Sequence, residues 1–330
     1  MSSWSEFLQT QTVQPVLSDA NALCGLDHLG IIRVSGADAR SFLQGQFSSD
    51  IQQLEADQTQ LSGYCNPKGR MLAIMRIVPT QDDLLLVLPK TLLPEIQKRL
   101  QLYILRSDVR LQDVSNTHAI LELAGSRVAD VMPAVPETDN AQIQIDERHS
   151  LRLPGDRPRY QIIGPVAAVQ KIWQKAIQKD LTPTDARAWR LLDIRAGLPM
   201  LYTATSEAFV PQMTNLHLLG GVSFQKGCYT GQEVVARMHY LGKQKRRMYR
   251  VHIAPGSLIE VGQALYAANA REQTVGTVLE IAPLDTTEGY EALVVCQINS
   301  MEQAALTIQA DSQPGPAITC LNLPYAYPVD

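Results

Sequence analysis

The apolar positions in the first third of the chain form short runs of the length and composition typical of strands. Leu29–Val34, Met71–Val78 and Leu84–Leu88 each predict a strand, and the polar turn Pro79–Asp83 should pair the last two. After this hairpin the apolar spacing changes to three and four, which predicts an amphipathic helix over Pro89–Leu102. This part of the chain therefore combines antiparallel strands with helix.

The segments before and after this hairpin and helix complete a split arrangement of strands and helices. Ser35–Gln44 predicts a short capped helix and His118–Leu123 a returning strand, which gives the β-α-β-β-α-β order of a ferredoxin-like α+β unit. The polar stretch Pro133–Ser150 predicts a connection. A second strand and helix follow at Arg159–Ile163 and Val166–Gln178, so the strand-then-helix pattern recurs.

A further helix is expected with Thr182 as its N-cap, Pro183 at its first position and its end at Gly197. Trp189 lies on the apolar face of this helix. A planar ring there either fills the core or stacks on a heteroaromatic ring beside a cavity.

The last quarter of the chain shows shorter strands separated by turn signals. Tyr249–Ile253 alternates apolar and polar residues, and Thr274–Ile281 and Ala292–Ile298 follow between glycine and proline turns. Short strands at this spacing predict an antiparallel barrel of about 85 residues.

Composition fits a chain of several domains. We expect one region over 1–242, with two α+β lobes that divide near 115–150, and a barrel over 243–330. Hydrophobic residues make up 45% of the 330 positions and charged residues 19%, which excludes global disorder. The net charge of −4 excludes a generally basic nucleic-acid binder but leaves room for a local basic patch.

The beginning of the chain and its cysteines bear on location. The first fifteen or so residues are polar and expected to be loose, and they carry neither a signal peptide nor a bilayer-spanning run. The five cysteines include no CxxC pair, and the six histidines show no metal-ligand spacing. A cytoplasmic protein with reduced thiols is therefore expected.

The strongest chemical signal lies in Phe224–Arg237. Thr230-Gly-Gln-Glu233 matches the capping box of a helix start, so a helix should begin at about Gly231. Cys228 would then precede the positive end of that helix, and Lys226 adds positive charge. Both favour a thiolate or a metal ligand. The alternative is a small buried cysteine in a tight loop.

A basic run follows directly. Arg237–Arg250 contains six lysines and arginines and no acid, as do patches that bind RNA phosphates or an anionic ligand tail, and also some solvated surface loops. The turn Cys65–Met71 carries two further cations, Lys68 and Arg70. They either face a carboxylate or keep a hairpin tip soluble.

Lys226–Arg237 resembles the signature of the YgfZ family of folate-binding proteins, which are related to the aminomethyltransferase of the glycine cleavage system. The resemblance covers nearly the whole chain and includes Phe209–Leu216, Ala196–Pro199, Lys68-Gly69 and Leu323–Tyr325. It implies an α+β fold in which two ferredoxin-like lobes and a C-terminal antiparallel barrel surround a central folate cavity.

The same resemblance implies a function. The protein would bind tetrahydrofolate or a folate derivative and help to assemble or repair iron–sulphur clusters in client enzymes. One such client is a tRNA-methylthiolating enzyme, so tRNA modification would be affected. Cys228 would be the essential thiol, with Lys226 beside it, and could be a cluster ligand shared with a partner. Folate contacts are expected at Trp189, Gln212, Asn215, Gly227 and Tyr229.

Three positions depart from the aminomethyltransferase pattern. Those enzymes carry a catalytic aspartate where Met71–Met75 is apolar, and a pterin-binding glutamate where this chain has Arg195. An aromatic residue of close relatives is replaced by Leu29. Aminomethyltransferase activity is therefore not expected, because proton transfer needs a positioned group. The alternatives are a folate-dependent aminomethyl or methyl transferase and an RNA-binding module that uses Arg237–Arg250.

Overall fold

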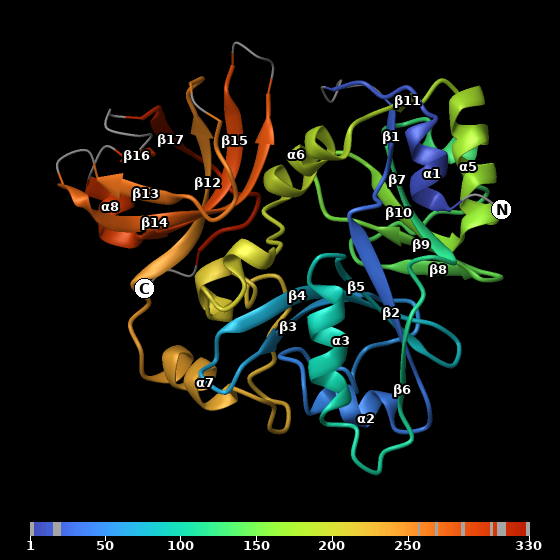
Figure 1. Cartoon of the computed structure of the whole chain (residues 1–330), viewed down its shortest axis with the longest axis horizontal. Coiled ribbons are helices and arrows are strands. Elements are labelled where there is room, and N and C mark those ends of the chain that lie inside the picture. The colour runs from blue at the N-terminus through green and yellow to red at the C-terminus, as the bar shows by residue number, and fades with distance from the viewer. Residues whose placement is uncertain are drawn as a thin grey trace.

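The computed structural model of the chain describes residues 3–15, 21–256, 258–267, 270–284, 288–303, 306–308 and 315–327. Within them, the strands form two open sheets and one closed barrel. Figure 1 shows the first sheet at the bottom, the second at the upper right and the barrel at the upper left. Helix α6 (Ala186–Ala196) lies between the second sheet and the barrel. No helix in these described ranges is long and apolar enough to cross a membrane.

The first lobe is a five-stranded sheet in the order β3-β4-β5-β2-β6. Its elements are β2 (Leu29–Ser35), α2 (Ala39–Gln44), β3 (Gln60–Cys65), β4 (Met71–Pro79), β5 (Leu84–Pro89), α3 (Leu93–Gln101) and β6 (Arg110–Asp113). The predicted strands β2, β4 and β5 and the β4–β5 hairpin are confirmed. The returning strand expected at His118–Leu123 forms instead, as β7 (His118–Ala124), in the other sheet, and β6 takes its place beside β2. Every residue of β4 and β5 is buried, so apart from Arg76 these strands are apolar without alternation.

The second lobe is a six-stranded sheet in the order β11-β1-β7-β10-β9-β8. Its elements are α1 (Trp4–Gln9), β1 (Ala22–Gly25), β7 (His118–Ala124), α4 (Val128–Val131), β8 (Gln142–Ile145), β9 (Arg148–Arg152), β10 (Arg159–Pro165), α5 (Val166–Gln178) and β11 (Thr182–Pro183). The predicted α5 is confirmed. The stretch Pro133–Ser150 instead contains β8 and part of β9, because an edge hairpin is held by backbone bonds and needs few apolar side chains.

The expectation of a loose N-terminus is wrong for the described part, which contains α1. Ser3 accepts a hydrogen bond from the N–H of Glu6, whose carboxylate accepts one from the N–H of Ser3. Trp4 and Phe7 pack edge-on against Trp173 of α5. The Ser-x-x-Glu spacing was the available sequence signal, and the contact with Trp173 stabilises so short a helix.

The predicted start of α6 is also wrong, whereas its end is confirmed. Thr182–Pro183 forms β11, which pairs in parallel with β1. The helix begins after Asp185, whose carboxylate accepts a hydrogen bond from the N–H of Arg187. Because Thr182 is paired with β1, it cannot cap the helix, and Asp185 is the N-cap instead. At Gly197 the backbone is left-handed, with φ 66°. A Cβ there would lie 2.7 Å from the ring of Tyr325.

The segment between α6 and the barrel contains η1 (Thr203–Thr205), η2 (Pro211–Thr214) and α7 (Gln232–Tyr240). Helix α7 begins where predicted, but the Thr230–Glu233 capping box is not formed. The N-cap is Gly231, at φ 82°, and no side chain caps the helix. A Cβ at Gly231 would lie 2.4 Å from the carbonyl oxygen of Asn66, so contact with the β3–β4 turn requires glycine here.

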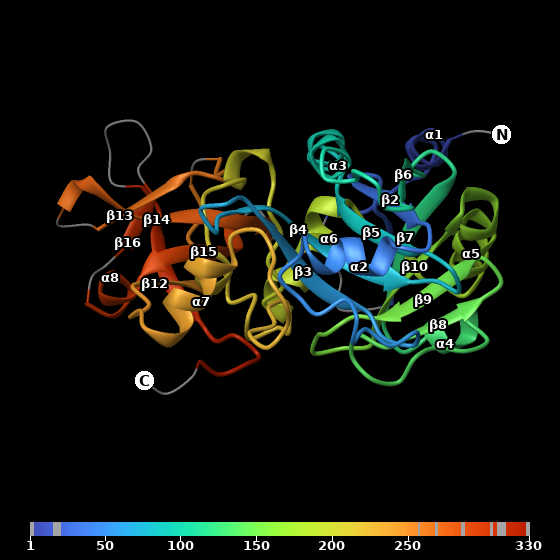
Figure 2. The ribbon, with the colours of Figure 1, turned by 90° about the horizontal axis from the view of Figure 1, so that it is seen from below.

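The barrel is closed in the order β12-β15-β14-β13-β16-β17. Its elements are β12 (Arg246–Ile253), β13 (Ala264–Ala267), β14 (Ala270–Pro283), β15 (Tyr290–Gln297), α8 (Ile298–Gln303), β16 (Leu306–Ile308) and β17 (Ala317–Leu321). Its pairings are antiparallel, as the turn spacing predicted. Helix α6 contacts β14 and β15 of the barrel and also β1 of the second lobe. Figure 2 shows the barrel at the left, the second lobe at the right and this helix between them.

Candidate functional site

Two small cavities, here called the central cavities, lie around α6. The larger has a volume of about 50 Å³ and is lined by both lobes and α6. Its polar lining consists of Arg76, Glu122, Gln161 and Asp193. The smaller, of about 20 Å³, is lined by Trp189, Arg190, Tyr202 and Glu280 among others, so the barrel contributes to it. Both cavities share Leu29, Asp193 and Met200, which makes them neighbours.

Glu122 is the central acceptor of the larger cavity. It lies on β7 and is only 2% exposed. One carboxylate oxygen accepts a hydrogen bond from the indole N–H of Trp189, and the other accepts one from the amide of Gln161 at 2.7 Å. Burial, assisted by the negative charge of Asp193, raises the pKa of Glu122 to about 7. The side-chain oxygen of Gln161 is buried without a hydrogen-bond partner, which leaves an acceptor unused at the cavity.

Two buried arginines balance these acids. Arg159 is fully buried and donates to the carboxylate of Asp193 at 2.6 Å. Arg76 donates to the hydroxyl of Thr59 at 3.0 Å and to the side-chain oxygen of Asn140 at 2.9 Å. Burial lowers the pKa of Arg76 to about 10, so it stays charged at neutral pH. The larger cavity is therefore lined by buried charged and amide groups that are hydrogen-bonded to their neighbours, within otherwise apolar strands.

The smaller cavity contains a second buried acid, Glu280 of β14. Its carboxylate accepts a hydrogen bond from the hydroxyl of Tyr202 at 3.0 Å and lies 3.5 Å from the guanidinium of Arg190 on α6. Burial raises the pKa of Glu280 to about 8. His28 lines the same cavity, and burial, followed by the charge of Arg190, lowers its pKa to about 4. His28 is therefore neutral at physiological pH.

The raised pKa values predict a pH-dependent stability difference. Above about pH 5 the unfolded chain has ionised Glu122 and Glu280, whereas the folded protein retains the proton of Glu122 up to a pKa of about 7 and that of Glu280 up to a pKa of about 8. Ionising them in the fold costs free energy, so their stabilising contribution is complete near pH 4.5 and is lost as pH rises through 7 and 8. Glu122→Gln should therefore gain stability relative to wild type as pH increases, measured as free energies of unfolding in urea.

The variant and the wild type must be compared at each pH. Buried histidines such as His28 also change the stability with pH, but in the opposite direction and at lower pH. Glu233→Gln is the matched control, because it makes the same chemical change at an exposed position of α7. A difference for Glu122→Gln that stays flat from pH 5 to 8 would contradict the raised pKa.

Of the residues predicted to bind folate, Trp189 lines the smaller central cavity. It is 1% exposed, packs with apolar residues of both lobes and donates its indole N–H to Glu122. The charged and amide groups around it were missed. A charge inside a run of buried apolar residues was the available signal, as for Arg76 within β4 and Glu122 within β7.

The departures noted in the sequence fall on or near these walls. Ile74 and Met75, from the apolar segment 71–75, line the larger cavity, and Leu29 lines both cavities. Arg195 does not line either one. Its guanidinium pairs with Glu291 of the barrel at 2.9 Å, so it joins α6 to β15.

The other predicted residues gather around the segment 225–230, here called the thiol loop. The ammonium of Lys226 is buried and donates to three backbone carbonyls, those of Gln44, Phe47 and Ser49, at 2.6–2.8 Å. Lys226 also lies 5.2 Å from the ring centre of the buried Tyr229. Cys228 between them is exposed. The loop is thus anchored on both sides of a solvent-facing thiol.

Gly227 has no positive φ, and a Cβ there would meet no atom within 4 Å. Gln212 and Asn215 are buried next to the barrel. The amide of Gln212 donates to the carbonyl of Val235 at 2.7 Å, and that of Asn215 donates to the carbonyl of Met248 at 3.0 Å. These bonds hold η2 against α7 and β12. Gln212, Asn215, Gly227 and Tyr229 do not line the central cavities, so their role as folate contacts stays a prediction.

The described residues contain no group of three or more histidine, cysteine or acidic side chains that could hold a metal ion. Cys24, Cys65 and Cys296 are buried, whereas Cys228 and Cys320 are exposed. Burial raises the pKa of Cys65 to about 12 and that of Cys296 to about 11, so these thiols stay protonated.

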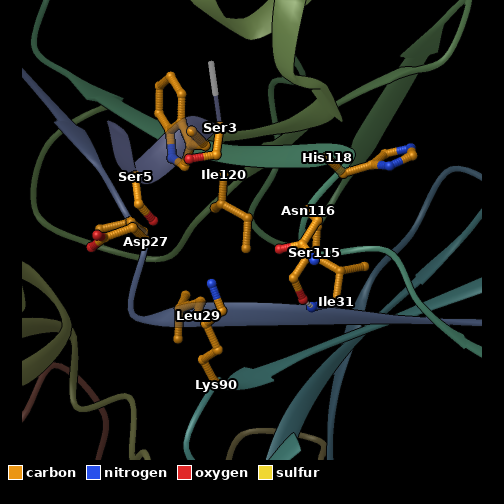
Figure 3. A pocket seen from close by; sticks show the side chains of 12 residues that line it. Ser3, Ser5, Asp27, Leu29, Ile31, Lys90, Ser115, Asn116, His118 and Ile120 are labelled. Atoms are coloured by element: carbon orange, nitrogen blue, oxygen red, sulfur yellow. Dashed lines mark hydrogen bonds between the residues drawn. The ribbon is translucent and has the colours of Figure 1, made fainter. Parts of the chain in front are cut away.

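A further pocket of about 70 Å³ lies beside α1, between the β1–β2 and β6–β7 connections (Figure 3). Two of its polar side chains are engaged. The hydroxyl of Ser115 accepts from the N–H of Ile31 and donates to Asp113. Both ring nitrogens of His118 lie within hydrogen-bond distance of Arg33 or Thr117. Neither Trp189 nor Glu122 reaches this pocket.

The fold is that of a known enzyme class. The crystal structure of the glycine cleavage system aminomethyltransferase T from Bartonella henselae superposes with a TM-score of 0.76 and 15% sequence identity. The match covers 97% of this chain and 88% of that one. Residues 10–151 also match the family model of the GCVT N-terminal domain.

Curated relatives show to which family with this fold the chain belongs. The tRNA-modifying protein YgfZ of Photorhabdus laumondii is 31% identical over 92% of this chain and 92% of its own. That of Enterobacter sp. (strain 638) is 30% identical over 85% and 86%, and that of Yersinia pseudotuberculosis is 32% identical over 69% of each. The chain belongs to the YgfZ family.

Proposed function

We propose that the protein binds a reduced folate, tetrahydrofolate or a derivative of it, at the central cavities. The observation that carries this proposal is the set of acceptors from Glu122, Gln161 and Asp193 beside the buried indole of Trp189. A pterin ring is flat and presents N–H donors along one edge. Acceptors in an apolar setting suit that edge, and an adjacent aromatic ring suits its face.

The residues present fit the chemistry of a pterin, but a cavity of about 50 Å³ is smaller than its ring. Met75 and Met200 line the space, and methionine side chains change rotamer at low cost. Folate binding therefore includes movement of these side chains. Two ferredoxin-like lobes around one cavity are part of the same proposal, supported by the strand order β6-β2-β5-β4 of the first lobe.

Tetrahydrofolate supplies the capacity to carry a one-carbon unit. The residues of this chain bind and orient it: Trp189 lies against the cavity, while Glu122 fixes the indole and keeps an acceptor there. The wall formed by Ile74 and Met75 has no proton-transferring group, which favours an accessory role over aminomethyl transfer.

The relatives are named tRNA-modifying proteins, and we propose that this chain likewise affects tRNA modification, in the cytoplasm. It would do so by helping to assemble or repair the clusters of iron–sulphur enzymes such as a tRNA-methylthiolating enzyme. Cys228 is the exposed thiol that would contact the client. One thiolate cannot hold a cluster alone, so any cluster would be shared with that partner.

Titration calorimetry with tetrahydrofolate tests the site. Trp189→Phe keeps an aromatic side chain but removes the hydrogen bond to Glu122, and should weaken binding about fivefold, equivalent to about 1 kcal/mol. Trp173→Phe is the matched control, because Trp173 is equally buried but lies in another cluster of the second lobe. Equal affinity in the two variants would remove Trp189 from the site, and no binding by wild type would refute the proposal.

A further inference from the structure

The end of α7 and the connection to β12 form a basic and aromatic surface, here called the α7 surface. It consists of Phe224, Arg237, His239, Tyr240, Lys243, Lys245 and Arg246. Both views show α7 at the periphery of the molecule, away from the two sheets' other helices (Figures 1 and 2). Side chains on it can therefore be reached by a large partner.

The cations of this surface form no ion pairs with the carboxylates that the structure describes. Arg237, Lys243 and Lys245 are exposed, and no carboxylate in the described parts of the chain forms an ion pair with them or with Arg246. The far end of the basic run differs, because Arg250 pairs with Glu291 at 2.6 Å. The free charge is thus confined to 237–246.

Arg247 is likewise engaged, since its guanidinium lies 4.6 Å from the ring centre of Tyr327. Glu233, one turn before Arg237, is the only acid on α7. In a protein of net charge −4, four free cations with a single nearby acid form a local positive field that attracts polyanions.

Aromatic rings are interleaved with these cations. His239 stacks on Phe224 with ring centres 3.7 Å apart and an interplanar angle of 10°. Tyr240 meets His239 edge-on at 4.8 Å and is 64% exposed. Tyr240 also follows Arg237 by three positions, which places a cation and an open ring on one face of the helix.

We propose that the α7 surface binds single-stranded RNA, with the cations on phosphates and an unpaired base stacked on Tyr240 or on the His239–Phe224 pair. A surface that offered cations alone would bind an acidic protein as well as it binds RNA. The exposed rings of His239 and Tyr240 among the cations favour nucleic acid, because every base offers a planar face. Unpaired bases are required, since those of a duplex already stack on one another. This proposal does not depend on folate binding.

Fluorescence anisotropy with a labelled twelve-nucleotide oligoadenylate and the corresponding duplex RNA tests the proposal. Four phosphate contacts predict a slope of about −3 for the logarithm of affinity against the logarithm of salt concentration. Lys243→Gln/Lys245→Gln should reduce that slope by about 1.4, whereas the control Lys98→Gln/Lys171→Gln, at exposed positions on α3 and α5, should leave it unchanged. Tyr240→Ala should weaken binding about 5- to 100-fold with little change in slope.

Stronger binding of the single strand than of the duplex supports the proposal. It is overturned if the oligonucleotide does not bind, or if both double variants behave alike. It is also overturned if Tyr240→Ala binds normally while polyglutamate of equal charge displaces the RNA, because the surface then belongs to an acidic protein partner. Folate titration of Lys243→Gln/Lys245→Gln separates the two proposals, since its folate affinity should equal that of wild type.

Discussion

Lys226→Met is expected to lower the free energy of unfolding by about 3–5 kcal/mol. The ammonium of Lys226 donates to three carbonyls in the turn after α2, and all three bonds are 2.8 Å or shorter. Methionine fills a similar volume but donates nothing, so the carbonyls of Gln44, Phe47 and Ser49 lose their charged donor in a region with little water. Burial lowers the pKa of Lys226 to about 8, and the three carbonyls favour its charged form at neutral pH.

Urea unfolding at pH 7 measures this loss. Lys98→Met, an exposed position on α3, makes the same chemical change without buried partners and should alter stability by no more than about 0.5 kcal/mol. A similar small effect at Lys226 would mean that the carbonyls find other donors, and that the lysine acts in chemistry rather than in anchoring the thiol loop.

Cys228→Ala is expected to abolish the biological function while leaving the fold intact. The thiol is exposed between two buried neighbours, Lys226 and Tyr229, so its removal leaves no cavity and should change stability by no more than about 0.5 kcal/mol. What it removes is a soft ligand or nucleophile at a fixed place on the surface.

Complementation of a deletion strain measures the effect, with the activities of several iron–sulphur enzymes as the readout. Cys228→Ala should leave them at the level of the deletion strain, whereas Cys320→Ala, at the other exposed cysteine, should restore them. Restoration by Cys228→Ala would exclude a mechanism centred on its thiol. Tetrahydrofolate affinity should be unchanged, because Cys228 does not line the central cavities.

Elements with strong local patterns were predictable from the sequence. Apolar runs predicted β4 and β5, and helical spacing predicted α5, because burial of one contiguous surface determines each of them. The start of α6 was not predictable in this way. Thr182-Pro-Thr-Asp185 contains two plausible caps, and only the pairing of Thr182–Pro183 with β1 selects Asp185.

The candidate site could be predicted only in part. Trp189 was predicted from the resemblance, whereas its partner Glu122 comes 67 positions earlier, on a strand that resembles any buried strand with one polar residue. Gln161 and Arg159 are likewise buried polar residues on a strand, β10, that is otherwise mostly apolar. Sequence patterns report which residues are buried, but they do not report which buried polar groups meet.

By itself, the sequence determined most of the strands and helices, the barrel and the family, since these depend on local periodicity and on residues adjacent in the chain. Tertiary structure alone decided where the thiol points and which charges remain free. Lys226 reaches carbonyls 177 to 182 positions earlier, which leaves Cys228 in solvent. Packing of the barrel engages Arg250 with Glu291, whereas no carboxylate in the described ranges pairs with Arg237, because ion pairs form between groups that the fold brings within a few ångströms.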